Sequence, residues 1–115
     1  MVNFLPLDEF FKIVEESWPF DKKEYPCLEN MTERNQDVFA MKHVLNHMSK
    51  SHGVLAGILE RVDHGERFDR ATCSDAIRKQ LVNIARLATL VDVGPNELDR
   101  GVKTWLREAK GMTFD

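Results

Sequence analysis

The hydrophobic pattern is clearest over residues 41–62, where apolar side chains recur at steps of three and four. At about 100° per residue, these steps place them on one face of an α-helix wide enough to be buried in a bundle. Thr32 is a suitable N-cap and Gly65 suits a left-handed C-terminal position, so a helix is predicted over about 32–62. Its apolar residues are Met41, Val44, Leu45, Met48, Leu55, Ile58, Leu59 and Val62.

Two details of this helix bear on its packing. His52 falls near the centre of the apolar stripe, so we expect a buried imidazole with a hydrogen-bond partner. Gly53 and Gly57 lie one turn apart, which is compatible either with the close approach of another helix or with two merely tolerated glycines.

A shorter helix is expected before this one, over residues 7–18, because apolar residues follow Pro6 at helical spacing. Residues 19–31 contain two prolines and alternating charges, which is typical of a loop. The aromatic and aliphatic residues of this loop should pack against the neighbouring helices. They are Phe20, Tyr25 and Leu28.

Two more helices are expected after the long one. The first covers about 70–92, and its apolar positions repeat at steps of four and three. Its apolar residues are Ile77, Leu81, Ile84, Ala88 and Val91, and its N-cap candidates are Asp69, Thr72 and Ser74. Gly94 and Pro95 then interrupt the chain before a last helix, for which Asn96 is the expected cap and Gly111 the end.

No segment alternates apolar and polar residues as a half-buried strand would, so a sheet is not expected. The chain of 115 residues has the length of a single domain, 1–115, with one core. We therefore predict an all-α, four- to five-helix bundle in which the two long helices, about 32–62 and 70–92, pack antiparallel as its centre.

Charge narrows the classes of partner. The 16 lysines and arginines are outnumbered by 19 acids, so nucleic-acid binding is not favoured. The densest basic cluster, Arg78, Lys79 and Arg86, is expected to form a solvated helix face. Cys27 and Cys73 form no metal or disulfide motif, and the chain shows neither a basic leader nor an apolar stretch long enough to span a membrane. A cytoplasmic protein with reduced thiols and no membrane partner is expected.

Candidate chemistry gathers on one flank of the long helix. His43 and His47 are four residues apart, a spacing at which two imidazoles can share a metal ion. The sequence HExxH is absent, however, and no third ligand is indicated, so two histidines lining a groove or interface are the other interpretation. Neither GxSxG nor a phosphate-binding glycine loop occurs.

Two segments carry a family resemblance. Residues 50–56 read KSHGVLA and residues 80–83 read QLVN, followed by ARLATLVDVGPNEL over residues 85–98. This text resembles the MazG-like group of all-α nucleoside triphosphate pyrophosphohydrolases, in which EExxE and ExxD motifs bind magnesium. At the positions matched to those acids, this chain carries Lys50, Ser51, Val54, Gln80 and Asn83. The resemblance thus implies the fold, while the residues predict no magnesium chemistry, because magnesium requires anionic oxygen ligands. No cofactor is expected.

Three functions follow as alternatives. The first is a MazG-like ligand-binding or assembly module without pyrophosphohydrolase activity. The second is an active nucleotide hydrolase with an altered site containing His43 and His47, and the third is a structural helical protein unrelated to MazG. A groove that hydrogen-bonds a small anion or nucleotide is expected from His43, His47, Lys50, Ser51, Val54, Gln80 and Asn83. Wide apolar faces on a small chain, together with the resemblance, predict a homodimer or a dimer of dimers.

Overall fold

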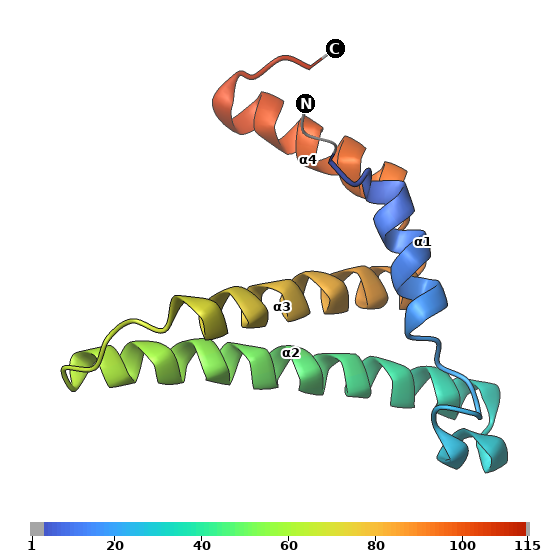
Figure 1. Cartoon of the computed structure of the whole chain (residues 1–115). Coiled ribbons are helices and arrows are strands. Elements are labelled where there is room, and N and C mark those ends of the chain that lie inside the picture. Colours follow the sequence, from blue (N-terminus) through green and yellow to red (C-terminus); the bar gives the residue numbers. More distant parts are fainter. Residues whose placement is uncertain (1–3, 115) are drawn as a thin grey trace.

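The structure is a computed structural model that describes residues 4–114, and this part of the chain is helical without a β-strand (Figure 1). The prediction of an all-α protein is confirmed. Its elements are α1 (Leu7–Ser17), the 3₁₀ helix η1 (Pro26–Asn30), α2 (Glu33–Asp63), α3 (Arg70–Leu90) and α4 (Pro95–Lys110). Within the described residues, no helix combines the length and the apolar character that crossing a membrane requires.

The centre of the fold is an antiparallel hairpin of α2 and α3 (Figure 1). Thr32 caps α2, since its Oγ1 accepts a hydrogen bond from the Asn35 amide at 3.2 Å. Asp69 is the cap of α3 and accepts from the amide of Thr72 at 3.0 Å. Gly65 has a φ of +89° just after α2, a conformation that glycine adopts without steric cost. The expected cap and turn residues thus direct the chain back along α2.

The seam between α2 and α3 consists of residues spaced by about a heptad. Val44, Ser51 and Ile58 of α2 are buried there, and Ala76 and Asn83 of α3 are buried opposite. Steps of seven residues return to nearly the same side of a helix, so these residues form one line along each helix.

The two shorter helices pack at one end of the hairpin. Phe11 and Val14 of α1 bury against Ala85 and Ala88 of α3, and α4 continues from there with no buried residue of its own. Figure 1 shows α1 and α4 directed away from the hairpin instead of lying along it. The radius of gyration is 17.7 Å, against about 13 Å for a compact domain of this length. The described chain is therefore an open arrangement of four α-helices.

Several local expectations need correction. The segment before α2, expected to be a loop, contains η1. Helix α4 begins at Pro95 with Gly94 as its cap, so Asn96, the expected cap, lies inside its first turn; proline is favoured at the first position of a helix. Helix α3 ends at Leu90, two residues before the expected end at position 92. Asp92 itself has a positive φ of 58°, which an α-helix does not allow.

The structure decides two questions about packing on α2. A Cβ at Gly53 would have no neighbour within 4 Å, and one at Gly57 would meet only the Arg61 side chain at 3.7 Å. Among residues 4–114, no other helix approaches this strip, which favours the interpretation of two tolerated glycines. His52 is exposed, because it lies about 100° around the helix from the buried Ser51.

Candidate functional site

The register of the hairpin gives it two different sides. On α2, the residues at offsets −4, −1 and +3 from the buried Ser51 are His47, Lys50 and Val54. The same offsets from the buried Asn83 on α3 give Lys79, Val82 and Arg86. In an antiparallel pair of right-handed helices, equal offsets from the seam turn side chains toward the same side of the pair. All six of these residues therefore share one side of the hairpin.

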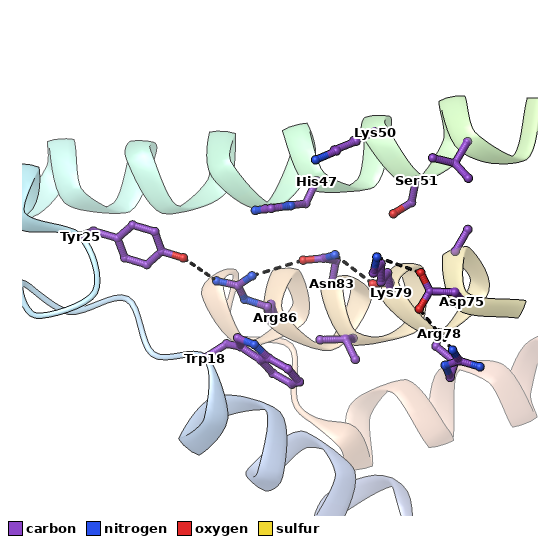
Figure 2. A pocket seen from close by; sticks show the side chains of 13 residues that line it. Trp18, Tyr25, His47, Lys50, Ser51, Asp75, Arg78, Lys79, Asn83 and Arg86 are labelled. Carbon is purple, nitrogen blue, oxygen red and sulfur yellow. Dashed lines mark hydrogen bonds and ion pairs between the residues drawn. The ribbon is translucent and has the colours of Figure 1, made fainter. Parts of the chain in front are cut away.

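This side holds a cavity of about 600 Å³, which we call the groove. Trp18 at the end of α1 and Tyr25 from the segment before α2 close one end of it (Figure 2). The residues that line it are Trp18, Tyr25, His47, Lys50, Ser51, Val54, Asp75, Ala76, Arg78, Lys79, Val82, Asn83 and Arg86.

The groove is strongly cationic. Its lining includes Lys50, Arg78, Lys79 and Arg86, whereas Asp75 is the single acid. Asp75 is already engaged by Lys79 at 2.8 Å and by Arg78 at 3.2 Å, contacts that hold the pKa of this carboxyl below its ordinary value. Lys50 and Arg86 have no salt-bridge partner within residues 4–114, so positive charge is left over in the groove.

Arg86 is the centre of the site. The residue is only 8% exposed, its guanidinium carbon lies 4.4 Å from the centre of the Phe20 ring, and its Nη1 donates to the Asn83 amide oxygen at 3.4 Å. Its Nη2 donates to the Tyr25 hydroxyl, also at 3.4 Å, while Nε is buried without any hydrogen-bond partner (Figure 2). Buried arginines are normally paired with a carboxylate. Within the described residues, the hydrogen-bond partners of this guanidinium are neutral groups at 3.4 Å.

Two histidines continue the network from Tyr25. The Tyr25 hydroxyl lies 3.2 Å from His43 Nε2, and His47 Nε2 lies 3.0 Å from the same His43 atom. Because an unprotonated imidazole nitrogen has one lone pair, His43 Nε2 can accept a full hydrogen bond from either Tyr25 or His47, and the tautomers of the two rings decide which group donates. Burial, followed by the nearby charges of His47 and Arg86, lowers the pKa of His43.

The structure brings most of the expected groove residues together. Those that line the groove are His47, Lys50, Ser51, Val54 and Asn83. His43 stands behind His47, stacked on Phe39 and in contact with Tyr25. Gln80 lies apart, since its Nε2 donates to the Met48 carbonyl at 3.0 Å between the two helices.

The expectation that Arg78, Lys79 and Arg86 form a solvated face is wrong for Arg86. The short α1 and the aromatic segment before α2 pack over this residue, which the helix pattern of α3 by itself does not show. One signal was available in the sequence: Arg86 stands three residues after Asn83, so both belong to one side of α3. Trp18 and Tyr25 carried no comparable signal, because loop geometry decides their place.

His43 and His47, the two candidate metal ligands of the sequence, lie next to each other. Around them, within residues 4–114, no group of three histidines, cysteines, aspartates or glutamates is arranged to hold a metal ion. Cys27 and Cys73 are free thiols.

Comparisons of the chain with models of protein families, with curated proteins and with solved structures found no match.

Proposed function

We propose that this chain is a metal-independent binding module whose groove between α2 and α3 holds a small anion. The observation that carries the proposal is Arg86, a buried guanidinium for which residues 4–114 supply no carboxylate and no partner for Nε. A buried charge without a counter-ion is costly, and an oxyanion accepting from its N–H groups would supply the missing partner.

The groove offers further donors for such an anion. The Tyr25 hydroxyl already lies beside the guanidinium, and Lys50 and Lys79 line the same cavity from opposite helices. Carboxylate, sulfate or phosphate oxygens match a planar guanidinium in two-point hydrogen bonding. A phosphate-bearing molecule such as a nucleotide is one ligand of this class.

The MazG-like origin of the fold is part of the proposal. It is supported by the positions matched to the metal-binding acids of that family, of which Lys50, Ser51, Val54 and Asn83 line the groove. With a lysine there instead of carboxylates, the groove opposes a magnesium ion and favours an anion directly. We also propose a cytoplasmic location, for which the two free thiols are the support.

Self-association belongs to the same proposal. The single chain exposes 9189 Å², whereas a compact monomer of 13.3 kDa exposes about 6,450 Å². The excess, about 2,700 Å², is more than the roughly 800 Å² that each partner contributes to an ordinary interface. A homodimer or a dimer of dimers would use this surface.

Binding of sulfate and of pyrophosphate, measured by isothermal titration calorimetry, tests the anion site. Arg86→Met should weaken both by about tenfold or more, because one charge-assisted hydrogen-bonding group is lost. Arg100→Met removes the same charge from exposed α4 and serves as the control. Equal affinity in the wild type and in both variants would contradict the proposal.

Hydrolysis is tested separately. We expect no pyrophosphate release from a panel of nucleoside triphosphates with magnesium, manganese or zinc. The alternative, an altered-site hydrolase using His43 and His47, is favoured by their Nε2 atoms lying 3.0 Å apart. Metal-dependent turnover that disappears in His47→Ala would establish this alternative and refute the binding module.

A further inference from the structure

The side of the hairpin opposite the groove carries an unusual amount of exposed apolar surface. Six large aliphatic residues, five in α2 and α3 and one directly after α3, are between 46% and 59% exposed there. We call this surface the apolar face, and it consists of Leu45, Leu59, Ile77, Leu81, Ile84 and Val91. Soluble monomers rarely leave so large a set of neighbouring aliphatic side chains in water.

The register explains why these residues gather on one side. Relative to Ser51 on α2, Leu45 and Leu59 stand at offsets −6 and +8. Relative to Asn83 on α3, the same offsets give Ile77 and Val91. Both offsets turn a side chain about 100° from the seam, away from the groove. Antiparallel helices therefore present these residues side by side.

The spacing along α2 is that of a helix-packing seam. Beginning at Leu45, it continues through Met48, His52 and Leu55 to Leu59, at steps of three, four, three and four. This heptad spacing is the pattern by which helices pack on other helices. It is separate from the seam of Val44, Ser51 and Ile58 that already contacts α3. Met48 and Leu55 of this second seam are half-buried, whereas Leu45, His52 and Leu59 are exposed, so residues 4–114 leave the outer part of the seam uncovered.

We propose that the apolar face is covered by the apolar face of a second copy of this chain, related by a two-fold axis, so that two hairpins form a four-helix bundle. The identification rests on the self-association proposed above and names its surface. A two-fold interface requires a self-complementary patch, and none of the six residues of the apolar face carries a charge that would repel its copy. The whole chain exposes about 2,700 Å² more than a compact monomer of its mass, whereas each partner of an ordinary interface contributes about 800 Å², so covering the apolar face would remove part of this excess.

The centre of the face adds a second feature. His52 and Ile84 stand at offset +1 from Ser51 and Asn83, midway between the ends of the face. A two-fold axis through the middle of the face therefore brings the His52 side chains of the two copies near one another. A polar residue at one position of an apolar seam selects register and number of helices while reducing stability.

The experiment is light scattering and sedimentation of the full chain over a range of concentrations. Leu81→Glu should weaken dimerisation by at least about 100-fold, because it would bury an unpaired charge. Val102→Glu is the control, since Val102 of α4 is 50% exposed, like Leu81 at 53%, but lies off this face. His52→Leu should act oppositely and tighten dimerisation by about tenfold or more, since it removes the polar interruption of the seam.

The outcomes separate the two proposals. A wild-type monomer at tens of micromolar would overturn both self-association and the apolar face as its site. An oligomer that survives Leu81→Glu but dissociates on Val102→Glu would overturn only the face and assign the contact to α4. If Leu81→Glu does not fold, His52→Leu decides, because unchanged or weaker dimerisation in that variant would contradict the face. If a folded Leu81→Glu monomer still binds the anion, the groove works without the dimer, and the anion site stands whatever the fate of the apolar face.

Discussion

The two sides of the α2–α3 hairpin are built from the same helical offsets but from opposite residue types. At offsets −4 and +3, which turn toward the groove, α2 and α3 contribute His47, Val54, Lys79 and Arg86. At offsets −6 and +8, which turn away, all four residues are aliphatic. Shifting the seam of each helix by two residues would turn the helix by about 200° and exchange many of the polar and aliphatic residues between the two sides.

This difference separates two kinds of recognition. On the groove side, Lys50 and Arg86 have no salt-bridge partner among residues 4–114, so the proposed anion would meet positive charge that the chain does not neutralise. On the apolar side nothing opposes close contact, so surface of the same kind from a second copy can cover it. The shared seam, with Ser51 and Asn83 at its centre, separates the groove from the apolar face.

The largest effect is expected when the shared seam is damaged. Ile58 is 1% exposed between the helices, so Ile58→Ala should lower the free energy of unfolding by about 2–5 kcal/mol. Urea unfolding at fixed protein concentration measures this change. Val102→Ala, on exposed α4, should cost less than about 0.5 kcal/mol. Equal losses from both substitutions would show that the hairpin seam is not the main source of stability.

Salt should act on the two sides in opposite directions. Raising potassium chloride from about 0.05 to 0.5 M screens the groove cations and should weaken pyrophosphate binding about tenfold. Burial of aliphatic surface is not screened, so dimerisation should stay constant or tighten. Calorimetry and sedimentation on the same samples check both results. Weaker dimerisation in salt would indicate an interface dominated by charge and contradict the apolar face.

A drop in pH should lower the stability of the fold while it raises the affinity for an anion. Burial lowers the pKa of His43 in the folded state below its ordinary 6.5, so the unfolded chain binds more protons as pH falls through this range. Stability is thus fully present above pH 6.5 and decreases as pH falls toward the pKa of the folded state. Protonation also places a hydrogen on both ring nitrogens of His43, so its Nε2 can no longer accept from Tyr25 or from His47.

Sulfate keeps its charge over this pH range, and its affinity should rise as His43 becomes protonated, because a further cation then stands behind the groove lining. Thermal unfolding and calorimetry at several pH values measure the two trends. His43→Gln should flatten both curves, whereas His64→Gln at the exposed end of α2 should leave them unchanged. Curves of the same steepness in His43→Gln would assign the dependence to another group.

The smallest effect is expected at the cap of α2. Thr32→Ala removes the acceptor of the Asn35 amide and should cost about 1 kcal/mol, while Thr32→Ser should restore most of the loss. Thr32 belongs to neither side of the hairpin, so anion affinity and dimerisation should both stay within twofold. A marked change in either would mean that the start of α2 positions that side.

From its sequence alone, this chain specifies four helices, the antiparallel hairpin and most of the groove. These features depend on local rules: the three-and-four spacing of apolar residues, the cap at Thr32 and the glycine at position 65. For α3 the sequence left three candidate caps, of which the structure uses Asp69. Five of the seven expected groove residues line it because residues of one helix register must share a side.

Only the tertiary structure decided which charges and apolar residues are covered. Arg86 is buried because α1 and the segment before α2 pack over one end of α3, a contact between segments more than sixty residues apart. His52 lies within the apolar stripe of α2 and was expected in the core, but it is exposed. Helix α3 covers only the part of this stripe around Val44, Ser51 and Ile58. Helical periodicity determines which side chains share a face, but the packing partners determine how much of that face leaves water.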